Sequence, residues 1–498
     1  MKPLQALVRP LANVPDPLAL YIHLTDGRSD TMFFGRPDAP SLLLVRAALR
    51  LECRGQEVRA TALGQAGDAA LRALCAAAGE RLVRNAAGEA LFAFPRIESP
   101  DPAERLAAPT AFDLVRILTS DASGEAADRF ARTCLGVVAF DHVDLLEDLP
   151  ANQEDPLGFP DYLFWLAEEL LVVEPDGSAR AILLNSEDER AARERLEALV
   201  RRCGEAPPLP EPPAPREPGF EAVDLDDAAF AEVVGAAKAS IAAGDVYQIV
   251  PSRTFRAPCP DPLAAFAAQR CADPSPYSFH VAAPDHQLFG CSPEAAVRVT
   301  QSVDGGLDVE VKPIAGTRGR GATADEDDRL EAELRLDSKE IAEHMMLVDL
   351  ARNDVARVSA PGTRRVSELL TVERYAKVMH LVSSVTGRLS PSADCLHALQ
   401  TCLNVGTLSG APKLRATQLL RSLERDRRGA YGGAVGWLNG AGEMDTGVVI
   451  RSAVVKDGTA YVRAGAGVVH DSDPAAEAKE TRRKAAALLG ALAGASAQ

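Results

Sequence analysis

The chain has 498 residues, 47% of them hydrophobic and 25% charged, a balance typical of soluble globular proteins, and this length predicts two to four domains. Acidic residues outnumber basic ones by 71 to 54, and the formal charge of −17 argues against a nucleic-acid or anionic-membrane partner, which needs basic surface. No apolar run approaches the ~20 residues of a membrane helix, and nine cysteines without a C-x-x-C pair indicate a reducing cytoplasm.

The first part of the chain ends at a proline-rich segment. Strand-like runs at Ser41–Val45 and Gly136–Phe140 are mixed with Ala-rich stretches that favour helix, and residues 187–202 predict a charged amphipathic helix. The segment at residues 204–218 contains seven prolines, so it can form neither a helix interior nor a central strand. We interpret it as an extended surface connector.

The second part begins with a predicted helix at residues 226–246 and continues with charged helices and glycine-punctuated strands. Strands grouped in this way, without strict alternation with helices, indicate an α+β fold with antiparallel ladders. The sequence therefore predicts an N-terminal domain at residues 1–203, a proline-rich linker at 204–219 and a C-terminal domain at 220–498.

Two predicted helices each carry a pair of glutamates three residues apart, a spacing that places both members on one helix face. The pairs are Glu340 with Glu343 and Glu477 with Glu480. Such carboxylates suit Mg²⁺, which binds through a few carboxylates and keeps several waters. The commoner alternative is two solvated faces with i,i+4 partners such as Glu480–Lys484, and the spacing alone leaves both open.

Three other residues of the second part are candidates for either a core or a site. Arg451 lies in an apolar, strand-like run, where an arginine is often buried against a carboxylate, and Tyr431 is flanked by glycines. His380 has apolar neighbours, and a lone histidine in that setting is more often a core residue than a catalyst.

Taken together, the segments between about residues 224 and 490 resemble the chorismate-utilising enzymes, and specifically the anthranilate synthase component I group. Eleven segments match in the same order, which is far more specific than any single motif. They read AGDVYQIVPSR, DPSPYSF, LFGCSPE, KPIAGTRGRG, KEIAEHMMLVDLARND, VMHLVSSV, GTLSGAPK, YGGAVGW, DTGVVIRSA, AGAGVV and EAKETRRKA. The N-terminal run SLLLVRAALRLECRG is similar to the group's first domain, but more weakly.

The resemblance implies two packed antiparallel β-sheets flanked by helices, with the active site in a central cleft of the chorismate-binding domain. The implied reaction adds ammonia to C2 of chorismate as the C4 hydroxyl leaves, and then eliminates pyruvate to give anthranilate. It implies Mg²⁺ as cofactor and either tryptophan biosynthesis or an anthranilate-derived secondary pathway.

The resemblance also implies roles for individual residues. Glu294, in S-P-E, matches the general acid that protonates the leaving hydroxyl, and His380 matches the histidine linked to pyruvate elimination. Glu343 and Glu480 match the family's metal-binding carboxylates, and Glu340 and Glu477 match the carboxylates that support them. The remaining matches line the substrate site: Thr407, Arg451, Tyr431, Gly465, Gly467, Thr317, Ala315 and Lys484.

Two positions select the branch of the family. Relatives that add water carry a lysine base where this chain has Gln248, and relatives that make aminodeoxychorismate carry a lysine where it has Ala315. Both residues favour direct addition of ammonia, which needs no base. The chain lacks a G-x-C-x-G glutaminase elbow, and we interpret Cys134 as a core residue, so a separate glutamine amidotransferase subunit in a heteromer is implied.

Two alternatives stay open. One is an aminodeoxyisochorismate synthase that releases the intermediate, and the other is a catalytically silent partner that binds a small anion. The family's feedback pocket predicts a weak response to tryptophan here, because Arg36 and Ser278 replace a hydroxyl and a thioether while Pro276 and Tyr277 remain. Arg36 would place positive charge near the ligand's ammonium.

Overall fold

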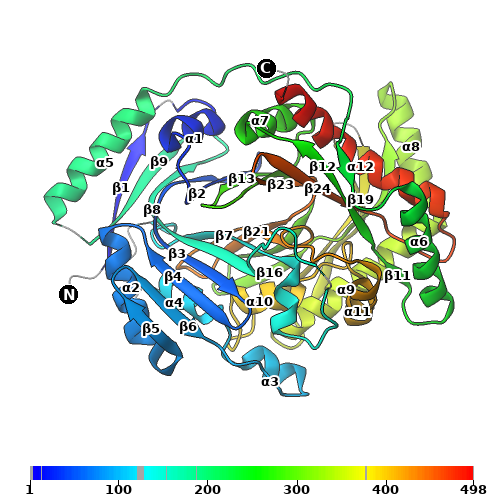
Figure 1. Cartoon of the computed structure of the whole chain (residues 1–498), viewed down its shortest axis with the longest axis horizontal. Coiled ribbons are helices and arrows are strands. Elements are labelled where there is room, and N and C mark those ends of the chain that lie inside the picture. Colours follow the sequence, from blue (N-terminus) through cyan, green and yellow to red (C-terminus); the bar gives the residue numbers. More distant parts are fainter. Residues whose placement is uncertain are drawn as a thin grey trace.

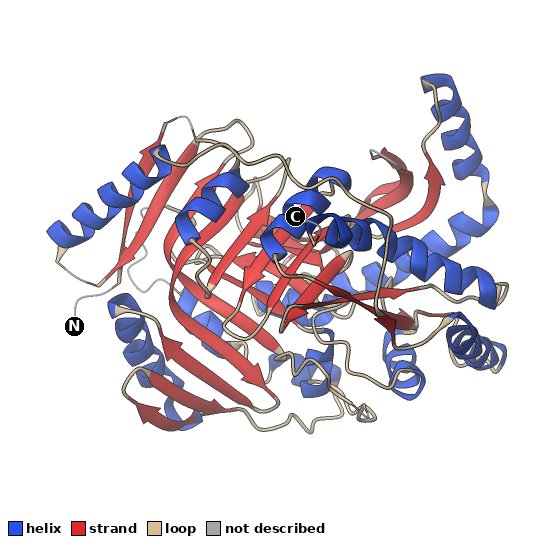
Figure 2. Cartoon of the chain, turned by 45° about the horizontal axis from the view of Figure 1, so that its top comes forward, coloured by secondary structure: helices blue, strands red, loops and turns tan. Residues whose placement is uncertain are grey.

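The computed structural model describes all residues except 1–3, 13, 121–127, 153, 187, 376, 377, 497 and 498. All but two of its named strands form one hydrogen-bonded network, and every ladder between named strands of this network is antiparallel. The network folds over into two packed sheets with helices outside, as Figure 2 shows. This confirms the predicted α+β class with antiparallel ladders.

Two long strands, β3 (Ser41–Arg54) and β8 (Tyr162–Val173), join the sheets because each takes part in both. Their first sheet contains these further strands: β1 (Gln5–Leu11), β9 (Ala179–Asn185), β2 (Thr31–Gly35), β13 (Tyr277–Ala282), β14 (Gln287–Ser292), β23 (Ser452–Lys456), β24 (Thr459–Gly465), β12 (Ser252–Pro258) and β10 (Ala222–Val223). The ladder between β3 and β8 shifts register between Leu44 and Leu49, where the two strands pass from one sheet to the other.

The second sheet carries most of the candidate site strands. Its further strands are β5 (Leu82–Ala86), β6 (Glu89–Ala93), β4 (Glu57–Ala62), β7 (Cys134–Val138), β21 (Ala434–Leu438), β22 (Met444–Val448), β15 (Ala295–Gln301), β16 (Leu307–Val311), β19 (Val378–Arg388), β17 (Ile314–Gly319) and β18 (Arg365–Arg374). A separate two-stranded pair joins β11 (Gln248–Ile249) to β20 (Gly410–Ala411).

Three apolar clusters hold these layers together. The cluster between the sheets packs Phe34 and Phe279 of the first sheet with Trp165 and Trp437 of the second. A second cluster joins the first sheet to α1 (Pro17–Thr25), α5 (Glu189–Gly204), α7 (Pro262–Ala272) and α12 (Pro474–Ala495). A third joins the second sheet to α2 (Gln65–Ala78), α4 (Asp113–Thr119), α9 (Ser338–Val358) and α10 (Cys395–Cys402). The order is therefore helices, sheet, sheet, helices.

The remaining helices lie at the edges of this stack. They are α3 (Pro102–Ala107), α6 (Asp227–Ala242), α8 (Ala324–Leu336) and α11 (Lys413–Leu423), with short 3₁₀ turns at Gly79–Arg81 and Phe140–Leu145. The predicted helix at residues 187–202 is α5, and Glu187 lies outside the described residues. Cys134 is fully buried in β7, as predicted for a core residue.

The two halves of the chain share both sheets. Strand β2 pairs with β3 on one side and with β13 on the other, and β7 lies between β8 and β21. Between the halves, residues 206–219 form neither helix nor strand and run over the outside from α5 toward α6 (Figure 1). The division at residues 203 and 220 stays a prediction, and the shared strands mean that neither half completes a sheet alone.

Candidate active site

Glu294 occupies the turn between β14 and β15, with its side chain turned inward. It is 8% exposed, and burial raises the pKa of its carboxyl to about 7, although the charge of Lys484 acts in the opposite direction. Thr407 donates a hydrogen bond from Oγ1 to Glu294 Oε1 at 2.6 Å. A carboxyl group that keeps its proton near neutral pH can act as a general acid.

The backbone at residues 465–467 brings three other candidate side chains together. Lys484 Nζ donates to the carbonyl oxygen of Gly465 at 3.0 Å. A Cβ on Gly465 would lie 2.9 Å from the Tyr431 hydroxyl oxygen, and a Cβ on Gly467 would lie 2.8 Å from Gln248 Nε2. Gly465 therefore leaves no room for a side chain, since its Cβ would also lie 2.9 Å from the Pro251 carbonyl oxygen, whereas a side chain at residue 467 would require Gln248 to move.

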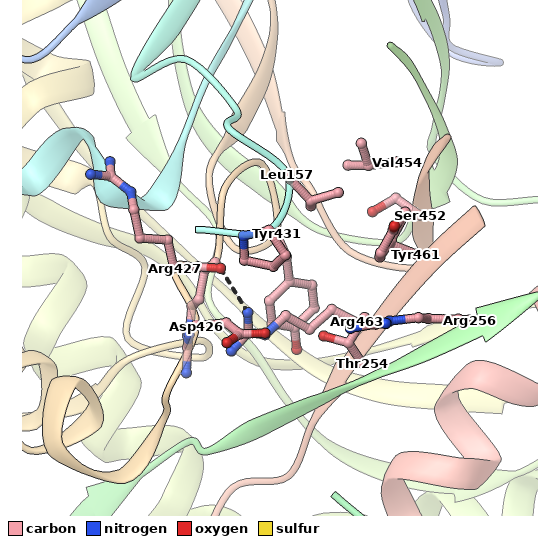
Figure 3. Close-up of a pocket in the computed structure, with 12 residues that line it drawn as sticks. Leu157, Thr254, Arg256, Asp426, Arg427, Tyr431, Ser452, Val454, Tyr461 and Arg463 are labelled. Atoms are coloured by element: carbon pink, nitrogen blue, oxygen red, sulfur yellow. Dashed lines mark hydrogen bonds between the residues drawn. The ribbon is translucent and has the colours of Figure 1, made fainter. Parts of the chain in front are cut away.

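Buried arginines pack beside the Tyr431 ring. Burial raises the pKa of its phenol to about 12, and the Arg428 guanidinium lies 5.8 Å from the ring centre. Glu424 accepts hydrogen bonds from both Arg428 and Arg463. Figure 3 shows Tyr431 near Arg463, which donates to the carbonyl oxygen of Arg427 at 3.0 Å. The cavity there has a volume of about 20 Å³, room for about one water, so this cluster supports Tyr431 rather than binding a substrate.

His380 lies on β19 directly opposite Thr317 of β17. Thr317 Oγ1 and His380 Nδ1 are 3.0 Å apart, and Ala315 precedes Thr317 on the same strand. Burial lowers the pKa of His380, and the positive charge of Arg451 lowers it further. The imidazole is therefore neutral at physiological pH and free to accept a proton.

Arg451 differs from its predicted setting. It does not lie inside a strand, because β22 ends at Val448 and β23 begins at Ser452, and its side chain is 36% exposed. The expected carboxylate is Asp273, whose Oδ2 lies 3.4 Å from Arg451 Nη1. Arg451 has a φ of 50°, a left-handed conformation that is costly for a residue with a Cβ and is found most often at functional sites.

The predicted acidic helices are α9 and α12, and an aspartate caps the N-terminus of each. Asp337 accepts hydrogen bonds from the backbone at the start of α9, and Asp473 does the same for α12. Burial raises the pKa of Glu343, and the like charges of Glu340 and Glu477 add to this effect. Glu340 of the same helix and Glu477 of the other helix therefore both lie close enough to Glu343 to repel its charge.

Three of the four glutamates have ion-pair partners. Glu340 lies 3.6 Å from Arg318, and Glu343 lies 3.9 Å from Lys339. Glu480 pairs with Arg483 and, at 3.7 Å, with Lys484. Within the described ranges, no three His, Cys, Asp or Glu side chains converge closely enough to hold an ion as they stand. The four carboxylates nevertheless supply hard oxygen donors from two helices, and Mg²⁺ needs only one or two protein carboxylates beside water and substrate oxygens. The residues present therefore fit Mg²⁺.

The candidate effector residues lie at a separate cavity of about 370 Å³, whose walls include Arg36, Pro276 and Tyr277. Arg36 is buried there, and its guanidinium donates to Asp445 at 2.7 Å and to the Tyr277 hydroxyl at 3.2 Å. Ser278 does not line the cavity, because its hydroxyl donates to the carbonyl oxygen of Gly35 at 3.3 Å.

Comparison with known proteins is consistent with this geometry. A family described as chorismate binding enzyme matches residues 84–490. The chain belongs to this family. Within it, anthranilate synthase component 1 of Vibrio cholerae is 43% identical over 98% of this chain and 96% of the relative. The pyocyanine-specific component 1 of Pseudomonas aeruginosa is 46% identical over 91% of this chain and 87% of the relative.

Solved structures of this family have the same fold. The crystal structure of anthranilate synthase component I from Streptococcus pneumoniae matches with a TM-score of 0.71 at 29% identity, covering 91% of this chain and 93% of that one. The chain is thus a member of the anthranilate synthase component I group, and the fold implied by the resemblance is confirmed. No helix in the described part of this family member has the length and apolar character that crossing a bilayer requires.

Sequence analysis missed the buried partners of the site residues. The pairing of Arg451 with Asp273, a residue of the DPSPYSF segment, and the ion pair of Asp354 with Lys413 were not predicted. Both members of that pair lie in motifs that were recognised, L-A-R-N-D and G-T-L-S-G-A-P-K, so a charged residue at the end of each motif was the available signal.

Proposed function

We propose that this enzyme converts chorismate and ammonia to anthranilate and pyruvate, with Mg²⁺ as cofactor. The observation that carries the proposal is the buried Glu294 carboxyl, whose pKa of about 7 and hydrogen bond from Thr407 suit an acid that works near neutral pH. Hydroxide is a poor leaving group, so the first step needs such an acid.

In the first step, ammonia forms a bond to C2 while the ring double bonds shift and the C4–O bond breaks. Glu294 gives its proton to the departing oxygen, which leaves as water. The nitrogen loses its extra proton to solvent, and Glu294 recovers one, so protons balance. Gln248 is the polar side chain beside Gly467, and its buried Oε1 has no hydrogen-bond partner among the described atoms. This oxygen can therefore accept a hydrogen bond from an N–H group.

In the second step, the C2 proton is lost and the C3–O bond breaks, so the ring becomes aromatic and enolpyruvate leaves. A proton taken up at the methylene carbon of enolpyruvate then gives pyruvate, so protons balance. The neutral His380, fixed by Thr317, is the group we assign to this step. Arg451 and Tyr431 bind the enolpyruvyl carboxylate, because a guanidinium and a phenol hydroxyl can both donate hydrogen bonds to it.

Glu343 and Glu480 would hold Mg²⁺, with Glu340 and Glu477 in support, and the ion would neutralise the ring carboxylate. Since the chain is strongly acidic, a cation and the Lys484 and Arg451 side chains would supply the local positive charge that a dianionic substrate needs.

We further propose that ammonia comes from a separate glutamine amidotransferase subunit in a cytoplasmic heteromer. The relatives' names number them as component 1, which fits a chain that needs a second component. The two names are compatible with either a primary or a secondary pathway, since one relative is named as pyocyanine-specific and the other is not.

The test is product analysis by mass after incubation with chorismate, Mg²⁺ and an ammonium salt at alkaline pH. We expect anthranilate and pyruvate in equal amounts. Release of aminodeoxyisochorismate without pyruvate would instead assign the chain to the enzymes that stop after the first step, and no turnover at all would favour a silent anion-binding partner.

A further inference from the structure

A buried ion pair lies behind Glu294 and has no part in the mechanism above. Asp354 of α9 pairs with Lys413, the first residue of α11, and their side chains are 7% and 19% exposed. Lys413 Nζ also donates to the carbonyl oxygen of Cys402, the last residue of α10, at 3.0 Å. One ammonium group therefore ties together the two ends of the loop at residues 403–412.

That loop carries Thr407, the hydrogen-bond partner of Glu294. The preceding residue, Gly406, packs so closely on α9 that a Cβ there would lie 2.5 Å from Leu350 Cδ1. Glu294, Thr407 and Asp354 line one cavity of about 30 Å³. Asp354 and the acid thus line the same small cavity, and Lys413 joins Asp354 to the loop that carries Thr407.

We propose that Asp354 and Lys413 are positioning residues, which hold the Thr407 hydroxyl against Glu294 and thereby set the pH range in which Glu294 donates its proton. The inference rests on the proposed role of Glu294 as general acid. Packing on the second sheet fixes α9, and with it Asp354. A buried carboxylate left without its lysine would be strongly destabilised. The ion pair therefore holds Lys413, and the loop that Lys413 joins, against α9.

The direction of the effect follows from the charges around the two groups. Burial raises the pKa of Glu294, whereas the Thr407 hydrogen bond and the charge of Lys484 lower it. Burial also raises the pKa of Asp354, while Lys413 and Arg357 lower it. Loss of the ion pair releases the loop, weakens the Thr407 hydrogen bond and so leaves Glu294 protonated to higher pH.

The experiment compares pH profiles of kcat for Thr407→Val, Asp354→Asn and the double variant. A hydrogen bond to a charged group is worth about tenfold or more in an equilibrium constant. We therefore expect Thr407→Val to shift the alkaline limb of the kcat profile to higher pH by about one unit. Asp354→Asn should move it in the same direction, and adding Asp354→Asn to Thr407→Val should move it no further.

Two controls separate positioning from folding. Lys413→Arg keeps the charge and should retain the wild-type profile, which also tests the pair if Asp354→Asn fails to fold. Arg415→Gln, on the same helix but paired with Asp245 at an exposed site, should leave the profile unchanged.

The inference is wrong if Asp354→Asn lowers kcat or the melting temperature without moving the profile, or if its effect persists in the Thr407→Val background. An unchanged profile in Thr407→Val itself, with full turnover in Glu294→Gln, would instead overturn the proposed role of Glu294. The two failures are therefore distinguishable.

Discussion

Replacing Glu294 with glutamine should slow turnover and at the same time stabilise the folded protein. The substitution hardly changes side-chain size and keeps an oxygen that can accept the Thr407 hydrogen bond, but it removes the acidic proton. Loss of a general acid typically costs ~10²–10⁴-fold in rate. Chorismate binding should be retained, because the change leaves Arg451, Tyr431 and Lys484 in place.

The stabilisation follows from the pKa of the buried carboxyl. Burial raises it from an ordinary value of 4.5 to about 7, so the folded protein binds this proton more tightly than the unfolded chain does. Stability is therefore greatest below 4.5 and is lost as pH rises toward 7, to a limit of about 3 kcal/mol. Glutamine does not ionise, so the variant escapes this cost.

Chemical denaturation at two pH values measures the effect. The advantage of Glu294→Gln over wild type should grow by about 2 kcal/mol between about pH 5.5 and about pH 8. Glu221→Gln, the same chemical change at an exposed glutamate, should show no such growth. An advantage that stays constant with pH would refute the raised pKa, and near-normal kcat in Glu294→Gln would mean that another group protonates the leaving hydroxyl.

The remaining predictions concern the metal, the elimination and the effector cavity. Glu343→Gln and Glu480→Gln should each abolish turnover with little loss of thermal stability, and full activity after treatment with EDTA would contradict the need for Mg²⁺. His380→Ala should slow elimination more than amination, so aminodeoxyisochorismate should accumulate in mass-resolved products; its absence would remove His380 from that step. Tryptophan should inhibit weakly, because the Arg36 guanidinium in the cavity wall already binds the buried Asp445 carboxylate and the Tyr277 hydroxyl; half-inhibition at micromolar tryptophan would show that the cavity still works as an effector site.

Local sequence patterns predicted the elements of this fold better than their arrangement. Strand-like runs indicated the first residues of β3 and part of β7, which lies two residues earlier than the predicted run at 136–140, and glutamate spacing indicated the helix faces of α9 and α12. The pairing of β2 with β13 joins residues almost 250 positions apart, for example Met32 with Val281. No local pattern carries that information, because any half-buried strand can pair with any other whose hydrophobic face matches. The interleaving of the two halves was therefore missed.

The candidate site shows the same division between residue type and environment. The S-P-E motif located Glu294, but an acid differs from an ordinary surface glutamate only by the burial that raises its pKa. That burial is created by cavity walls from α9 and α10, whereas the hydrogen bond from Thr407, more than 100 residues further along the chain, lowers the pKa again in part. The position of Thr407 in turn depends on a loop whose two ends meet at Lys413. A motif names the reacting group, whereas its proton affinity is a property of the whole packed neighbourhood, and this is why the buried partners are where further control of the chemistry should be sought.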